Sequence, residues 1–250
     1  MTEDPIRRLM QMGRDLSKVR LPTLPQSLDS VAFICVNAYE SFRSGEGKGP
    51  LNDAVHFAKM FKSYCYEIYF IVSPNVKNFL EYFDTFLEKA TNRLITLYLG
   101  HETFKTPEND KNEAFLFSDG IITNSVVIDH ITQKKQAHSE LIMISDACQP
   151  SSIWNINNGI VAGVKIPPRI LSISAANADE DFEITAVQAR LNASAFTKLV
   201  VKALKNNSAV TPQQLLSMAG KELEKYNQTF VVGSSSSELL KVPLFLNEYQ

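Results

Sequence analysis

Residues 94–100 read Leu-Ile-Thr-Leu-Tyr-Leu-Gly and residues 141–147 read Leu-Ile-Met-Ile-Ser-Asp-Ala, and these two apolar runs decide the fold. Each run is short and mostly aliphatic, which is typical of a strand buried on both faces of a parallel sheet. His101 follows the first run directly, and Cys148 follows the second. The sequence therefore predicts two buried strands that each end in a reactive side chain.

The rest of the chain repeats this alternation of buried strands and amphipathic helices. Because strands that alternate with helices form parallel sheets, we expect an α/β fold with a mainly parallel sheet of six or more strands and helices on both faces. Ligands bind such sheets at the carboxyl ends of the strands. Further strands are predicted at residues 31–36, 66–72, 170–174 and 242–246, and helices at about 53–65, 76–90, 125–133, 184–204 and 212–226.

The first 29 residues read as an N-terminal arm, and residues 30–250 as the domain itself. Asp4 and Pro5 form a good helix start, and a short helix is expected to run to about Val19. Pro22 and Pro25 then favour an extended linker. The arm is either packed on the domain or a removable pro-segment.

Net charge and cysteine count indicate which partners and which compartment to expect for this chain. The net charge is −2 over 250 residues, with acids and bases interspersed, so we expect neither a nucleic-acid nor a membrane partner. Three cysteines, Cys35, Cys65 and Cys148, are an odd number without metal-ligand spacing. This pattern favours a reducing compartment, and hence a cytoplasmic protein, over a disulfide framework or a metal site.

His101 and Cys148 form a candidate catalytic pair on position alone. Adjacent parallel strands lie about 4.8 Å apart, so two strand ends can bring an imidazole close to a thiol. A nearby imidazole favours the thiolate, which is the nucleophilic form of cysteine. Taken one at a time, Cys148 is also explained as a small core residue and His101 as a surface histidine.

The residues around this pair resemble the caspase superfamily of cysteine peptidases. Residues 146–150 read Asp-Ala-Cys-Gln-Pro, and His101 lies 47 residues before the cysteine (148 − 101), close to the caspase spacing. Aspartate two positions before the cysteine is similar to the metacaspases of protists, plants and fungi. Other segments resemble that group in the same order, namely residues 36–39, 49–54, 98–101, 113–120, 173–179 and 194–197.

This resemblance implies a cysteine endopeptidase that cleaves after Arg or Lys and acts as a monomer on protein or peptide substrates. Cys148 would attack the scissile carbonyl, and His101 would protonate the leaving amine. Backbone N–H groups of Cys148 and Glu102 would hold the oxyanion. Asp53 and Asp146 would form the pocket for the basic residue, with Leu99 in its lining. Without the resemblance, Asp53 is explained as a helix cap beside Asn52, and Asp146 as a turn residue after its strand.

Three residues depart from the family pattern. The family has Ser-Gly-His-Gly where residues 99–102 read Leu-Gly-His-Glu, so Leu99 and Glu102 differ. The third is Pro150, which has no N–H to donate. These departures favour an alternative, a catalytically inactive relative that binds or regulates partners.

Two further expectations concern activation. Calcium activates many metacaspases, and hard oxygen ligands for it are present in Glu108, Asp110, Glu113 and Asp119. A charged loop of this kind is more often simply solvated. Lys165 and Arg169 are candidate sites of self-cleavage, and the alternatives are basic residues of the N-terminal arm, namely Arg7, Arg8, Arg14, Lys18 and Arg20.

Overall fold

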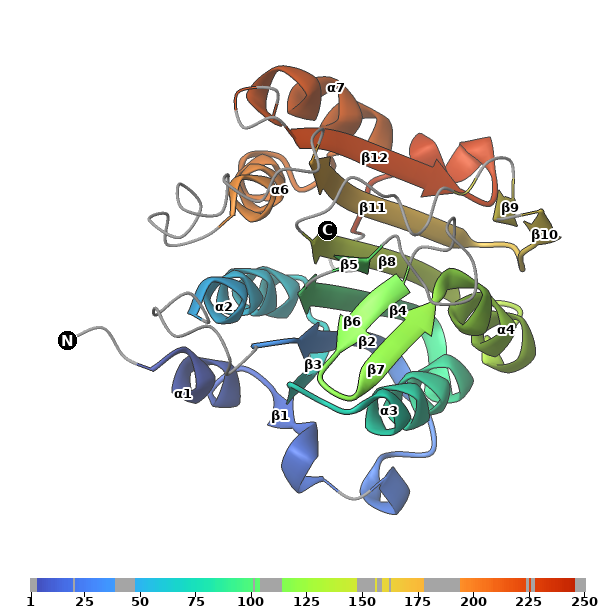
Figure 1. The fold of residues 1–250 in the computed structure, drawn as a ribbon. Helices are drawn as coiled ribbons and strands as arrows, with labels where there is room; N and C mark the ends of the chain where they lie inside the picture. Colours follow the sequence, from blue (N-terminus) through green and yellow to red (C-terminus); the bar gives the residue numbers. More distant parts are fainter. Residues whose placement is uncertain are drawn as a thin grey trace.

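The central sheet of the computed structural model has seven strands within the described residues, in the spatial order β1-β3-β2-β4-β8-β11-β12 (Figure 1). Six strands run parallel, and β12 runs antiparallel to β11. The strands are β1 (Arg14–Asp15), β2 (Leu28–Val36), β3 (Glu67–Val72), β4 (Ala90–Gly100), β8 (Glu140–Ala147), β11 (Ile170–Asn177) and β12 (Gln228–Ser234). The described residues are 4–19, 21–38, 48–100, 102–103, 114–147, 156, 159–161, 163–177, 194–223, 225 and 228–245.

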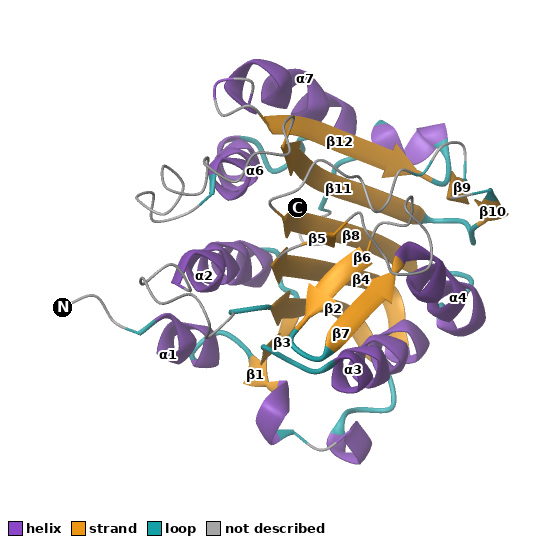
Figure 2. Ribbon diagram, viewed as in Figure 1, coloured by secondary structure: helices purple, strands orange, loops and turns teal. Residues whose placement is uncertain are grey.

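Helices cover both faces of this sheet (Figure 2). Alternate residues of β2 separate into two cores, with Ile34 on one face and Phe33 on the other, as the period of a strand requires. One core is closed by α1 (Pro5–Met10), α2 (Lys48–Ser63), α6 (Ala195–Asn206) and α7 (Pro212–Leu223), and the other by α3 (Val76–Lys89) and α4 (Asn124–Lys134). The predicted α/β class and mainly parallel sheet are confirmed.

The N-terminal helix is shorter than predicted, because it ends at Met10 rather than near Val19. Gly13 causes the difference: a Cβ atom there would lie 2.6 Å from Cγ2 of Ile68, so only glycine lets the chain approach β3. The next two residues then pair with β3 as β1, and short 3₁₀ turns follow at Leu16–Lys18 and Leu21–Thr23. Residues 14–15 of the arm thus form the edge strand of the sheet.

The predicted strand at residues 242–246 is wrong. Residues 242–245 lie in no strand, and residue 246 lies outside the described residues. The last strand in the described part of the chain is β12, which the sequence analysis did not predict. Leu244 and Phe245 are buried nonetheless, and the ring of Phe245 packs edge-on against Phe61 and Tyr66. The apolar run therefore reflects burial between helix and sheet, not strand pairing.

Two helix starts also differ from their predictions. α2 begins at Lys48, so Asn52 and Asp53 lie inside the helix and do not cap it. The helix predicted from residue 184 begins at Ala195, where Ser194 is the N-cap and its hydroxyl accepts from the N–H of Thr197. Residues 184–193 of that prediction lie outside the described residues.

A small three-stranded sheet, which the sequence did not predict, lies beside the carboxyl end of β4. It comprises β5 (Glu102–Thr103), β6 (Ala114–Phe117) and β7 (Gly120–Thr123). Side chains anchor it: the Tyr98 hydroxyl and the Asn37 amide both donate to the carbonyl of Leu116, at 2.8 and 2.9 Å. The chain that follows β4 therefore leaves the main sheet at Gly100.

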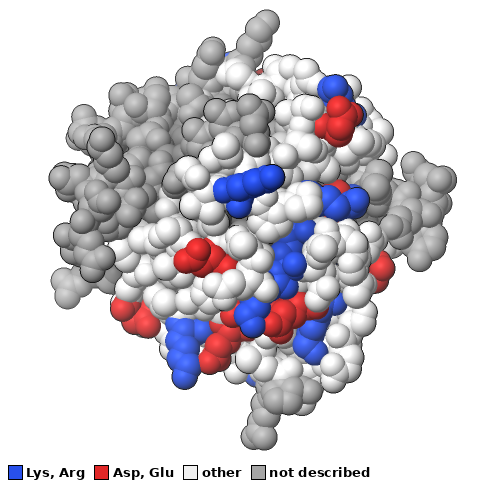
Figure 3. Space-filling view, turned by 90° about the vertical axis from the view of Figure 1, so that its right-hand side faces the viewer, with Lys and Arg blue, Asp and Glu red and all other residues white. Residues whose placement is uncertain are grey.

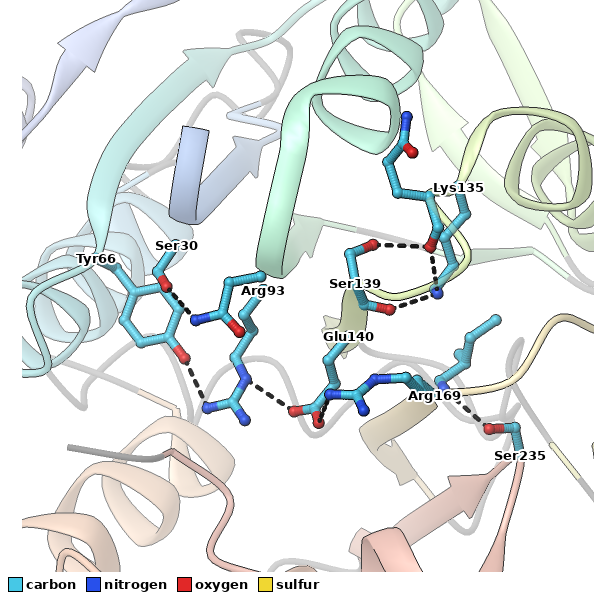
Figure 4. A network of polar contacts seen from close by, with 11 residues as sticks. Ser30, Tyr66, Arg93, Lys135, Ser139, Glu140, Arg169 and Ser235 are labelled. Carbon is cyan, nitrogen blue, oxygen red and sulfur yellow. Dashed lines mark hydrogen bonds and ion pairs between the residues drawn. The ribbon is translucent and has the colours of Figure 1, made fainter. Parts of the chain in front are cut away.

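A buried ion pair closes the opposite, amino-terminal end of the sheet (Figure 4). Arg93 of β4 contacts Glu140 of β8 at 2.8 Å, and its guanidinium also donates to the hydroxyl of Tyr66 at 3.3 Å. Arg169 reaches the other oxygen of Glu140 at 3.8 Å. The two strands that end near His101 and Cys148 are therefore also tied together where they begin.

We predict that Leu16→Ala lowers the free energy of unfolding by about 2–4 kcal/mol, because it leaves a cavity where a fully buried side chain packs. Urea unfolding followed by circular dichroism measures the change. Leu216→Ala is the matched control, since Leu216 is 44 % exposed. Equal losses in the two variants would show that the arm does not contribute to the core.

Candidate functional site

The carboxyl ends of β4 and β8 lie side by side. Gly100 pairs with Ala147, and Leu99 pairs with Asp146 in the same register. His101 and Cys148 are the residues that follow this last pair, and both lie outside the described residues, as do Gln149 and Pro150. The predicted order of strands is thus present up to the position before each member of the dyad.

Asp146 interrupts an apolar row that crosses the sheet at this end. Its register partners are Leu99 on β4 and Ala175 on β11, and Val36 on β2 pairs with Leu99. Leu99, Val36 and Ala175 are buried in the core beneath α2 and α6. Among these side chains Asp146 needs polar partners, because a carboxyl group without hydrogen bonds is costly to bury.

Ser194, the N-cap of α6, supplies those partners and links the two predicted aspartates. Its hydroxyl donates to Oδ2 of Asp146, and its backbone N–H donates to Oδ1 of Asp53 at 2.8 Å. The hydroxyl of Thr197, one turn into α6, donates to the same Oδ2 at 3.1 Å. Asp53 of α2 and Asp146 of β8, which lie 93 residues apart in sequence (146 − 53), therefore meet at the first turn of α6.

The pKa of each carboxyl group is raised above its usual value. Burial raises the pKa of Asp53 well above its usual value, the nearby charge of Asp146 raises it further, and the Ser194 N–H opposes both effects. Burial also raises the pKa of Asp146, against the hydrogen bonds from Ser194 and Thr197. Two acids that share a desolvated site in this way hold a proton between them more readily than either would in water.

The sequence analysis predicted that Asp53 and Asp146 share one pocket, but it assigned no role to Ser194 or Thr197. The segment Ser-Ala-Phe-Thr at residues 194–197 carried a signal, since a serine that directly precedes an apolar helical run is typical of a helix start. Leu99 is only 1 % exposed and packs in the core, so it offers the site an apolar wall.

The remaining predicted residues are placed as follows. The backbone of Glu102 lies in β5, paired with Phe115. Of the candidate calcium ligands, Glu108, Asp110 and Glu113 lie outside the described residues, and Oδ1 of Asp119 accepts a hydrogen bond from the N–H of Val76 at 2.9 Å. In the part of the chain that the structure describes, no three His, Cys, Asp or Glu residues are grouped to hold a metal ion.

The two candidate self-cleavage positions differ in their surroundings. Lys165 is exposed in the hairpin formed by β9 (Ile160–Val161) and β10 (Val164–Lys165). Arg169 directly precedes β11: its carbonyl accepts from the N–H of Leu141, and the next N–H donates to the hydroxyl of Ser235. Both the carbonyl and the N–H of the peptide bond after Arg169 are therefore hydrogen-bonded, and Figure 4 shows the bond to Ser235.

Comparisons with known proteins agree with this architecture. Caspase-1 from Spodoptera frugiperda is similar over 90 % of this chain and 94 % of its own, with a TM-score of 0.62 and 12 % identity. A structure titled pro-sf-caspase-1 is similar over 86 % and 94 %, with a TM-score of 0.61 and 11 % identity. At these identities the likeness shows the fold alone, which is that of caspases. No match to this chain was found among curated proteins.

The family model for the caspase domain, Peptidase C14, matches residues 30–242. Because this match covers most of the chain, the protein belongs to the caspase domain family, a family of cysteine peptidases. The predicted resemblance to the caspase superfamily is thereby confirmed. No helix in the described ranges has the length and apolarity needed to cross a bilayer.

We predict that Asp53→Asn stabilises the fold relative to the wild type, and increasingly so between pH 4 and pH 8. The pKa of Asp53 is raised by folding, so the wild type loses stability as the pH rises from the unfolded pKa toward the folded one. The amide that replaces the carboxyl group cannot ionise, and it keeps an oxygen for the Ser194 N–H. Urea unfolding over this pH range measures the difference.

The control for this prediction is Asp29→Asn, which alters an exposed carboxylate. A stability difference for Asp53→Asn that stays constant with pH, or that favours the wild type at pH 8, would contradict a shared proton at the acid pair.

Proposed function

We propose that this protein is a cysteine endopeptidase of metacaspase type that cleaves after Arg or Lys, with His101 and Cys148 as its catalytic dyad. The observation that carries the proposal is the pairing of Gly100 with Ala147, which puts the residues before the dyad on adjacent strands. Asp146 directly precedes Ala147, and both Asp146 and Asp53 bind Ser194. Two neighbouring carboxyl groups at this place support cleavage after a basic residue.

The dyad would work by nucleophilic catalysis. The Cys148 sulfur attacks the scissile carbonyl to give an acyl-enzyme, and His101 transfers a proton to the leaving amine. Water then releases the acyl group. Backbone N–H groups of Cys148 and Glu102 are the proposed oxyanion donors, each contributing about 3 kcal/mol in enzymes of this kind.

The acid pair would release its proton when the positively charged side chain of the substrate binds. In the unliganded site, burial raises the pKa of both carboxyl groups. A guanidinium or ammonium group offers a full positive charge and several donors, and so stabilises both carboxylates once the proton leaves. The hydroxyls of Ser194 and Thr197 both donate to Oδ2 of Asp146, so the proposed acceptor for the substrate is Oδ1.

We expect purified protein to hydrolyse fluorogenic peptides that end in Arg or Lys, and to leave those ending in Asp uncut. Cys148→Ala should lower kcat by about 10⁴-fold or more, because the nucleophile is removed. Cys65→Ala is the control, since Cys65 is an exposed cysteine in the turn after α2 and has no proposed role. Assays with and without calcium decide whether calcium is an activator. Turnover that survives Cys148→Ala would contradict the dyad.

Specificity has its own test. Asp146→Asn should lower kcat/KM for Arg substrates by about 100-fold, because a charge partner is lost inside a desolvated pocket. Asp129→Asn, on the exposed side of α4, is the matched control. Equal losses in the two variants would show that Asp146 does not recognise the basic residue.

A second candidate function is an inactive relative that binds or regulates active ones. Leu99 favours it, because this buried side chain presents no polar group to a pocket for Arg. Reactivity toward iodoacetamide separates the two candidates, since only a thiolate near neutral pH reacts quickly.

We predict that iodoacetamide labels Cys148 faster than Cys65 in the native protein and leaves Cys35 unlabelled. Burial raises the pKa of the Cys35 thiol and shields it, whereas Cys65 is exposed. Mass spectrometry of timed samples measures the three rates. Labelling of Cys148 no faster than that of Cys65 would favour the inactive relative.

A further inference from the structure

Basic residues gather on the outer side of α1, α2 and α6. α6 carries Lys198, Lys202 and Lys205 and no acidic residue in its sequence, and all three lysines are exposed. The one acid of α2 is Asp53, which is 6 % exposed and bound to Ser194. A chain whose net charge is −2 thus presents a strongly basic surface here.

Charge is arranged differently elsewhere on the molecule. On the face that Figure 3 shows, basic and acidic side chains lie next to one another. Outside α1, α2 and α6, basic side chains form ion pairs with acidic ones. Lys134 pairs with Glu88 at 2.7 Å, and Arg169 pairs with Glu140 at 3.8 Å. Positive charge is therefore compensated by nearby acids there, whereas the sequence of α6 supplies none to its lysines.

The basic surface is hollowed between α2 and α6. A groove of about 290 Å³ lies there, lined by His56, Thr197, Lys198, Val201, Lys202, Lys205 and Asn206. Lysines at positions 198, 202 and 205 follow one another by about 6 Å and 4.5 Å along the helix axis. Their ammonium groups can therefore reach several charges of one compact ligand in the groove.

His56 lies half-buried on the α2 side of the groove and is surrounded by cations. Burial lowers its pKa, and the positive charges of Arg8 on α1, Lys205 and Lys198 on α6, and Lys59 on α2 lower it further. No acidic side chain among the described residues contributes to this shift. An anion in the groove would relieve the repulsion between these groups.

We propose that the groove between α2 and α6 binds a small anion with several phosphate groups, held by Lys198, Lys202 and Lys205 and by His56. Its concave shape and volume fit a compact ligand. An extended polyanion would place most of its charge outside a groove of about 290 Å³. This proposal does not depend on the peptidase activity.

Isothermal titration of the full chain with inorganic tripolyphosphate tests the proposal. We expect saturable binding with one site per chain. The triple variant K198Q/K202Q/K205Q should bind at least about tenfold more weakly, which corresponds to about 1.4 kcal/mol. The control K77Q/K225Q/K241Q removes the same charge from exposed lysines on other elements and should stay within about twofold of the wild type.

His56→Gln adds a readout that a general loss of charge would not move. The affinity of the wild type relative to this variant should rise as the pH falls from 8 to 6, because binding favours protonated His56. The titration of tripolyphosphate itself is common to both proteins and cancels in the ratio. A ratio that does not change with pH would place the anion away from His56 and contradict the site.

Three other results would overturn the proposal. One is the absence of binding heat at millimolar tripolyphosphate, and another is an equal loss of affinity in the two triple variants. The third is tighter binding of a DNA duplex, an acidic peptide or anionic vesicles that is lost in K198Q/K202Q/K205Q, since it would assign the groove to a macromolecular partner.

Discussion

The carboxyl group of Asp146 is the constraint around which this end of the molecule is organised. It emerges from the sheet between Leu99 and Ala175, on a face that is otherwise apolar. The N-cap of α6 satisfies it through Ser194, and the same residue binds Asp53 of α2. The hydrogen bonds from Ser194 and Thr197 therefore fix β8, α2 and α6 relative to one another, two positions in sequence before Cys148. In the proposed function, the carboxyl group that binds the basic side chain of the substrate also positions the strand that precedes the nucleophile.

Much of the fold could be predicted from the sequence because buried parallel strands have a distinctive composition. The apolar runs at residues 94–99 and 141–145 are buried parallel strands, as their composition predicts. That Asp53 and Asp146 lie close together is implied by the resemblance to metacaspases, and both bind Ser194 in the structure. The errors have particular causes. The close approach of Gly13 to Ile68 is a tertiary contact that helix propensity does not contain. Phe245 is apolar because it fills a gap between α2 and the sheet, and a short apolar run of this kind looks like a strand in sequence.

Charge is distributed unevenly over the two helical layers. α3 and α4 are joined by the ion pair of Lys134 with Glu88 and by the hydrogen bond between His130 and Asp84, whereas α6 carries basic residues and no acidic ones. Lys198 connects this surface to the acid pair, because its positive charge lowers the pKa of Asp53. An anion that neutralised Lys198 would remove this effect and favour the protonated pair. The groove and the acid pair thus lie close together, and a charge in one changes the pKa in the other. Composition alone could not show this, because the net charge is a sum over both helical layers.

The position of Arg169 has a consequence for the kinetic order of any self-processing. Its carbonyl is bonded to Leu141, near the start of β8, and Ala147 lies six residues further along the same strand (147 − 141), about 20 Å away at about 3.3 Å per residue. A single copy cannot bring this peptide bond to its own carboxyl edge while β11 remains paired in the sheet. A cut at Arg169 would then require two molecules, and its rate would rise with the square of the protein concentration. Because the beginning and the end of a strand lie on opposite sides of the domain, a cut at Arg169 would be an encounter between two copies.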